Sequence, residues 1–120
     1  MQIKDVFLKI RDDYVIHQVA RAKVPAFRPG VVCRLRFVFS GRVQNVGFRL
    51  EAAEMADRLE LTGFCENLPN GDVLLELQGA KNRIAYLVFF LRSLTRIRVE
   101  HVTATRLPIN PTETVFIRGT

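Results

Sequence analysis

One short segment of the chain combines glycines and an arginine in a way that suits an anion. Gly41 and Gly47 frame this segment, and Arg49 follows at the start of an expected helix. Glycine permits backbone angles that let N–H groups approach an anion closely, and the first N–H groups of a helix lack internal partners. The planar guanidinium of arginine matches two phosphoryl oxygens. The segment therefore suits a phosphate or carboxylate ligand, although a plain strand-to-helix turn with a surface arginine would have the same pattern.

Asn67 is a second polar residue of interest. It directly precedes the turn Leu68-Pro69-Asn70-Gly71, in which Asn-Gly is a strong hairpin signal. Asparagine at such a place often only caps the turn, so its type and position alone favour a structural role. His101 is expected within a strand, far in sequence from both segments, and is interpreted as structural.

Hydrophobic patterning predicts the elements that position these residues. Alternating apolar residues indicate strands near residues 31–39, 61–66, 73–79, 97–107 and 113–118, and helical spacing indicates helices near 48–59 and 84–94. This order predicts an α+β, ferredoxin-like (βαββαβ) sandwich with an extra C-terminal strand. Right-handed crossovers place both helices on one face of an antiparallel-type mixed sheet. We expect the other face to be largely open to solvent.

The first 30 residues are expected to form an N-terminal extension, separate from a domain of residues 31–120. Apolar residues at helical spacing predict a short amphipathic helix, and a Pro- and Gly-containing linker follows at residues 24–30. We expect this extension to dock on the domain or to remain loose. The apolar residues that predict the helix are Ile3, Val6, Phe7, Ile10 and Tyr14.

Composition limits the possible environments and cofactors. The chain has no apolar run near the roughly 18 residues that span a bilayer, and its N-terminus does not resemble a signal peptide. We therefore expect a cytoplasmic protein without a membrane partner. Two cysteines and two histidines, scattered in sequence, favour neither a metal site nor a disulfide. The net charge of +6 is typical of proteins that meet anions, but it does not choose among nucleic acid, lipid and phosphorylated metabolites.

Two segments are recognisable as family motifs. Residues 41–49, Gly-Arg-Val-Gln-Asn-Val-Gly-Phe-Arg, resemble the acylphosphatase motif Gly-Arg-Val-Gln-Gly-Val-Gly-Phe-Arg at eight of nine positions. Residues 61–71, Leu-Thr-Gly-Phe-Cys-Glu-Asn-Leu-Pro-Asn-Gly, resemble the second motif, Leu-Thr-Gly-Trp-Val-x-Asn-Leu-x-Asp-Gly. The ending Val-Phe-Ile-Arg at 115–118 is similar to the family's last strand. The resemblance covers about residues 32–118 and leaves the extension outside.

The resemblance implies hydrolysis of the carboxyl–phosphate bond of small-molecule acyl phosphates, without a metal or another cofactor. It implies that Arg49 binds the phosphoryl group and that Asn67 orients the attacking water. Backbone N–H groups of the loop would surround the phosphoryl oxygens, and inorganic phosphate or sulfate would bind there as a product-like ligand. We expect a monomer. The loop residues concerned are Gln44, Asn45, Val46, Gly47 and Phe48.

The sequence departs from the family pattern at two places. Asn45 replaces the usual loop glycine, and a positive φ there would cost of order 1 kcal/mol. Glu60 stands where relatives often have glycine at the end of the first helix of the domain, with a similar possible cost. Neither departure removes a group to which the resemblance assigns a catalytic role.

Two other functions are compatible with the same predicted fold. One is a non-catalytic module that senses an anion or binds RNA, because RNA-binding domains of this topology carry aromatic residues on the open sheet face. Here Phe37 and Phe39 share their face with Cys33 and Leu35, which indicates the core, whereas Arg34 is expected to face outward. The other is that of a relative of the acylphosphatase domain found in hydrogenase-maturation carbamoyl-transfer proteins. The chain is too short to contain the other parts of such a protein.

Overall fold

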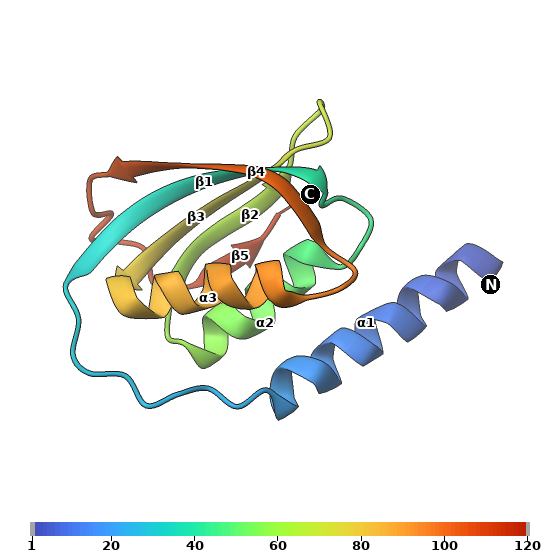
Figure 1. Cartoon of the computed structure of the whole chain (residues 1–120), viewed down its shortest axis with the longest axis horizontal. Coiled ribbons are helices and arrows are strands. Elements are labelled where there is room, and N and C mark those ends of the chain that lie inside the picture. The colour runs from blue at the N-terminus through green and yellow to red at the C-terminus, as the bar shows by residue number, and fades with distance from the viewer. Residues whose placement is uncertain (1, 120) are drawn as a thin grey trace.

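Five strands form one sheet in the computed structural model, which describes residues 2–119. They are β1 (Val32–Arg42), β2 (Thr62–Asn67), β3 (Val73–Ala80), β4 (Arg98–Leu107) and β5 (Phe116–Arg118). The order across the sheet is β4-β1-β3-β2-β5. All neighbours are antiparallel except β2 and β5, which are parallel. Helices α2 (Phe48–Arg58) and α3 (Lys81–Ser93) lie together on one face of the sheet (Figure 1). The predicted ferredoxin-like sandwich with an added C-terminal strand is confirmed.

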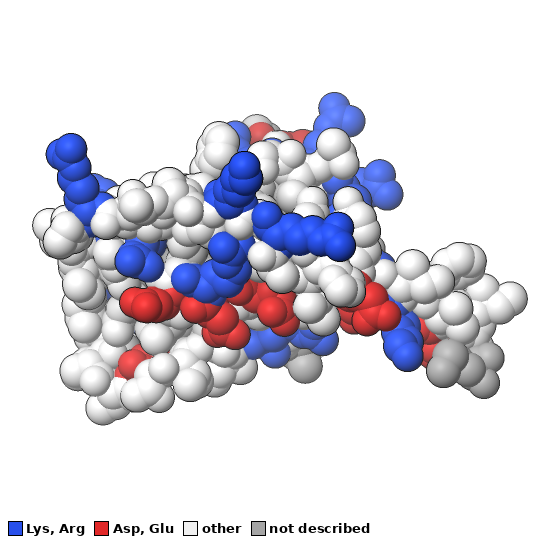
Figure 2. All heavy atoms as spheres, turned by 90° about the horizontal axis from the view of Figure 1, so that it is seen from below, with Lys and Arg blue, Asp and Glu red and all other residues white. Residues whose placement is uncertain are grey.

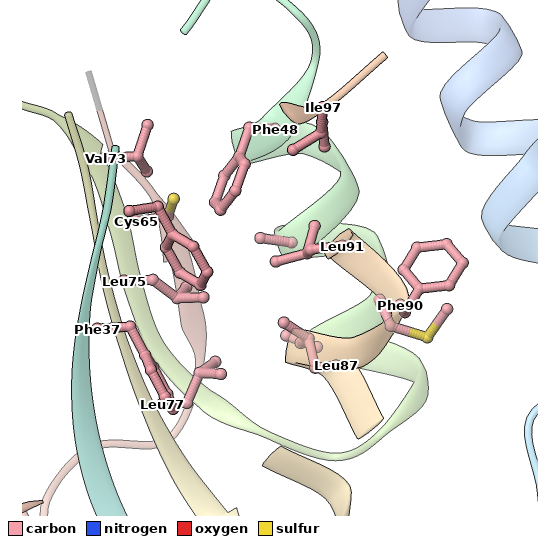
Figure 3. Packing of buried hydrophobic residues seen from close by; sticks show 14 of the residues in the cluster. Phe37, Phe48, Cys65, Val73, Leu75, Leu77, Leu87, Phe90, Leu91 and Ile97 are labelled. Carbon is pink, nitrogen blue, oxygen red and sulfur yellow. The ribbon is translucent and has the colours of Figure 1, made fainter. Parts of the chain in front are cut away.

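The core lies between the sheet and these two helices. Phe37 on β1 and Leu75 on β3 face Leu87 and Leu91 of α3, and Phe48 fills the space at the start of α2 (Figure 3). Each fully buried side chain of this size contributes roughly 1.5–3 kcal/mol to folding. The alternation of apolar residues along β1 therefore points its aromatic side chains into the core, as predicted, and not onto an RNA-binding platform.

Helix α2 ends in a cap that places Glu60 in a left-handed conformation. The N–H of Leu61 donates to the Ala56 carbonyl at 2.9 Å, and the N–H of Glu60 donates to Asp57 at 3.3 Å. Such a cap requires a left-handed residue after the helix, and Glu60 adopts a φ of 57°. The expectation of a non-glycine residue in a conformation that favours glycine is confirmed at this position.

The sheet face opposite α2 and α3 is not open along its whole length, contrary to our expectation. The connection between β4 and β5 folds across it, and Glu113 accepts hydrogen bonds of 2.8 and 3.0 Å from Arg34. Arg34 also donates to Glu76 at 3.0 and 3.1 Å, and it is only 6% exposed. The prediction that Arg34 faces solvent was wrong, because strand alternation tells which face a side chain occupies but not what covers that face.

Helix α1 (Ile3–Arg21) is longer than the short helix predicted, and it is docked beside α2 (Figure 1). Val15 and Val19 are its buried residues, whereas Phe7 is 66% and Ile10 is 59% exposed. The predicted helix is present, but the five residues that indicated it, Ile3, Val6, Phe7, Ile10 and Tyr14, are exposed and do not form its buried face. On the face seen in Figure 2, the projecting end of α1 shows mostly residues other than Lys, Arg, Asp and Glu. Within residues 2–119, no helix is both long and apolar enough to cross a membrane.

The linker from α1 to β1 is held against α3. The Tyr86 hydroxyl donates to the Lys23 carbonyl at 3.2 Å, and the Asn82 amide donates to Arg28 at 2.7 Å. Phe27 packs edge-on to Tyr86, with 5.7 Å between ring centroids. The Pro- and Gly-containing segment has no helix or strand, as predicted, yet these contacts keep the extension docked and not loose.

Candidate active site

The loop between β1 and α2 has a special backbone. Asn45 has a φ of 61° and Gly47 has a φ of 83°, so two left-handed residues lie within three positions. Alternation of this kind favours N–H groups that point to one side of the chain and can meet an anion. The Gly47 carbonyl then accepts the N–H of Glu51 at 2.9 Å, which begins α2. The expected positive φ at Asn45 is confirmed.

A cavity of about 230 Å³ brings together the two segments recognised in the sequence. Arg49 from the start of α2 and Asn67 from the end of β2 both line it, although 17 residues separate them in the chain. Of the five predicted loop residues, Asn45, Gly47 and Phe48 line the same cavity. The remaining lining residues come from four elements or their ends: Lys4, Leu8, Arg11, Val43, Leu50 and Arg118.

Gln44 and Val46 belong to the loop but do not line the cavity. The Gln44 side-chain amide donates two hydrogen bonds of 2.8 Å, to the carbonyls of Leu68 and Asp72. These bonds tie the loop to the turn between β2 and β3, which begins beside Asn67. The Val46 side chain is buried, and its carbonyl accepts a 3.4 Å hydrogen bond from Arg96. Neither contact could be predicted from the sequence, because the partners lie more than 20 residues away.

Arg49 is half-buried and lies beside Gly119, near the C-terminus. Its guanidinium donates a hydrogen bond to the carbonyl of Gly119. The charged side chains that line the cavity, within residues 2–119, are all basic: Lys4, Arg11, Arg49 and Arg118. The cavity is thus a site of positive charge, as an anionic ligand requires.

A partly buried hydrogen bond between Glu51 and Arg96 lies next to the loop. The Glu51 side chain is fully buried and accepts a 3.0 Å hydrogen bond from Arg96, which also contacts Val46. Burial raises the pKa of Glu51 to about 7, although the charge and hydrogen bond of Arg96 act in the opposite direction. The Arg96 guanidinium stacks 5.4 Å from the ring centroid of Tyr14 on α1. This cluster was missed in the sequence, where Glu51 has the ordinary pattern of an acid in a first helical turn.

The buried thiols are not placed for nucleophilic attack. Burial raises the pKa of Cys65 to about 12, despite the lowering effect of the Arg49 charge, so this thiol remains protonated. Cys33 is also buried and unbonded. Among residues 2–119, His, Cys, Asp and Glu side chains form no group of three or more that could hold a metal ion.

Comparison with known proteins agrees with this geometry. The family model described as Acylphosphatase matches residues 35–117, a range that contains the loop, Arg49 and Asn67. The chain belongs to the acylphosphatase family. Helix α1 lies outside the range that the acylphosphatase model matches.

Individual acylphosphatases show different extents of similarity. That of Clostridium perfringens is 51% identical over 51 residues, which cover 42% of this chain and 57% of that relative. The similarity thus spans less than two thirds of the length of such relatives. An acylphosphatase of Vibrio parahaemolyticus is 38% identical over 77 residues, which cover 63% of this chain and 86% of the relative.

Solved structures share the acylphosphatase fold. An acylphosphatase from Coxiella burnetii superposes with a TM-score of 0.67 at 28% identity, covering 73% of this chain and 93% of that one. Full-length HypF in its phosphate- and nucleotide-bound form gives a TM-score of 0.68 at 18% identity and is covered over 13% of its length. At this identity, the second likeness concerns the fold alone.

Proposed function

We propose that this chain hydrolyses the carboxyl–phosphate bond of acyl phosphates, releasing a carboxylate and inorganic phosphate. The main support is that Arg49 and Asn67 line one basic cavity together with residues of the loop at the start of α2. The substrate is a small molecule, because a cavity of about 230 Å³ is smaller than the roughly 300–1,000 Å³ typical of drug-sized ligand sites.

Arg49 and the loop bind the phosphoryl group. Arginine has five N–H donors, so the bond from Arg49 to the Gly119 carbonyl leaves donors for phosphoryl oxygens. Backbone N–H groups of residues 44–48 complete the cradle, with Asn45 and Gly47 in the left-handed conformations that turn the loop. Charge on the equatorial oxygens of a transferring phosphoryl group is stabilised by such fixed donors. Inorganic phosphate or sulfate binds here as a product-like ligand.

Asn67 holds the attacking water. Asn67 lines the same cavity as Arg49 and the loop, and its side-chain amide can both accept a hydrogen bond from a water molecule and donate one to it. The leaving group is a carboxylate whose pKa is about 4–5, comparable to that of Asp and Glu side chains. It therefore departs without a strong general acid, and positioning supplies much of the rate. The proposed reaction requires neither a metal nor another cofactor.

The proposal also includes a monomeric state and a cytoplasmic location. Two unbonded, buried cysteines are compatible with a reducing compartment. The proposal includes no membrane or nucleic-acid partner.

The test is release of inorganic phosphate from acetyl or benzoyl phosphate by the full-length chain. A phosphate monoester such as phenyl phosphate serves as the control, because its leaving group is much more basic than a carboxylate. We expect hydrolysis of the acyl phosphate alone. Binding of phosphate without any turnover of acyl phosphates would instead indicate a non-catalytic anion sensor.

A further inference from the structure

Helix α1 forms one wall of the cavity, although it lies outside the family match. Lys4, Leu8 and Arg11 of α1 line the cavity together with Arg49 and Asn67. Figure 1 shows α1 beside α2, the helix that begins at the phosphate-binding loop. An element that the matched part of the chain does not contain therefore contacts the same space as the proposed substrate.

The contact between α1 and the loop is close. A Cβ atom built on Gly47 would lie 3.3 Å from the Val15 Cγ2 atom and 3.6 Å from the Cδ and Nε atoms of Arg11. Val15 is fully buried, so this part of α1 is packed against the loop and is not a surface decoration. The Arg11 side chain is thereby held at the edge of the site.

The charges on α1 exceed what one phosphoryl group needs. Arg49 and the loop N–H groups already account for the phosphoryl oxygens in the proposed function. Lys4 and Arg11 add two cations on a different wall of the cavity. The Arg11 guanidinium pairs with Asp12 at 3.0 Å but keeps 27% of its side chain exposed, so it retains access to a ligand. Lys4 and Arg11 thus belong to a wall of the cavity that neither Arg49 nor the loop forms.

We infer that Lys4 and Arg11 form a second anion subsite, which selects acyl phosphates whose acyl group carries a further negative charge. This inference rests on the proposed function. The phosphoryl group occupies the loop and Arg49, and a carboxylate or phosphate at the far end of the acyl group pairs with the α1 cations. The guanidinium and ammonium groups bind either anion. Lys4 and Arg11 are thus specificity-determining residues contributed by the extension.

The test compares two substrates of the same chain length, butyryl phosphate and succinyl phosphate, which differ by a distal carboxylate. Steady-state kinetics of the full-length chain give kcat and KM for each. We expect a higher kcat/KM for succinyl phosphate, mainly through a lower KM. A third substrate with a distal phosphonate in place of the carboxylate distinguishes the two anions.

Four variants isolate the α1 cations. Arg11→Gln and Lys4→Gln should each lower the ratio of kcat/KM for succinyl over butyryl phosphate by up to about fivefold, the upper end of the range expected for a partly exposed charge pair. Lys9→Gln removes an exposed cation of the same helix that does not line the cavity, so the ratio should stay at the wild-type value. Arg11→Lys keeps the charge and should restore most of the preference. Thermal melts of every variant identify any that fail to fold.

The outcomes separate the two proposals. Hydrolysis of both substrates with equal kcat/KM, or equal effects of Arg11→Gln on both, would overturn the subsite while leaving the proposed function intact. Hydrolysis of neither substrate by the wild-type chain would overturn the proposed function and the subsite with it. A loss of preference in the Lys9→Gln control as large as that in Arg11→Gln would show a general charge effect and also overturn the subsite.

Discussion

The Gln44 side chain bonds to the Leu68 carbonyl at 2.8 Å, and this contact joins the two segments that supply the site. A second bond of 2.8 Å from the same amide reaches the Asp72 carbonyl on the other side of the turn. Leu68 follows Asn67 directly, so the Gln44 amide ties the loop to the residue beside Asn67. We propose that Gln44 is a positioning residue that acts through Asn67.

Gln44→Ala and Asn67→Ala should give non-additive effects. Asn67→Ala should reduce kcat strongly while phosphate affinity, measured by calorimetry, stays near the wild-type value. Gln44→Ala should reduce kcat by roughly tenfold or more, because small displacements of a positioned group are costly. In the double variant, the loss from Gln44→Ala should nearly vanish, since its target is already absent. Additive losses would contradict a role through Asn67.

Arg49→Lys should lose most turnover even though it keeps the positive charge. Lysine lacks the planar two-pronged donor set that matches phosphoryl oxygens, and removal of a donor to developing charge commonly costs about 10²–10³ in kcat. Arg49→Ala should be at least as impaired. Arg42→Lys at the exposed end of β1 is the matched control and should retain activity. Near-wild-type rates for Arg49→Lys would contradict the proposal that Arg49 binds the phosphoryl group.

Asn45→Gly should keep or raise activity. The φ of 61° at Asn45 is a conformation that glycine adopts without strain, and the relief is on the order of 1 kcal/mol. The expected gain in catalytic efficiency is therefore about tenfold or less. Kinetics of both proteins on one acyl phosphate provide the measurement. A fall of more than about tenfold would show that the Asn45 side chain is itself part of the site.

The stability of the wild-type chain should fall as pH rises from about 5 to about 7. Burial raises the pKa of Glu51 from 4.5 to about 7, so in this window the folded chain keeps a proton that the unfolded chain releases. The contribution is complete below pH 4.5 and is lost as pH passes the folded pKa, with a total of up to about 3 kcal/mol. Urea titrations at several pH values should show this slope, and Glu51→Gln should lack it. An identical slope in both proteins would mean that Glu51 does not titrate in this range.

A chain of residues 31–120 should fold without the extension. Of the buried apolar residues described, Val15 and Val19 alone precede residue 31, so the sandwich keeps nearly all of its core. We propose 31–120 as the domain, with 1–30 as a docked extension. The truncation should lose a few kcal/mol of unfolding free energy, at about 1.5–3 kcal/mol for each valine site. Denaturant titration and circular dichroism of both chains test this, and an unfolded truncation would refute the boundary.

Local backbone requirements could be predicted from the sequence. The alternation along residues 31–39 identified β1 and its core face, because side chains of a strand point to opposite sides with a period of two. Glycine-like conformations at Asn45 and Glu60 were also predictable, since both stand where the family motif has glycine. The resemblance to the two family motifs implied that Arg49 and Asn67 belong to one site, and the cavity brings them together.

Tertiary structure alone decided which surfaces meet. The buried face of α1 is that of Val15 and Val19, although Phe7 and Ile10 gave the stronger apolar pattern. Glu113 covers Arg34 from 79 residues away, and Arg11 reaches the edge of the loop from an extension without a recognised motif. Helical or strand periodicity is a property of a few neighbouring residues, whereas the partner of a face depends on how distant elements pack. The sequence by itself therefore determined the elements and the two motifs, and long-range packing decided that Lys4 and Arg11 of α1 line the same cavity as Arg49 and Asn67.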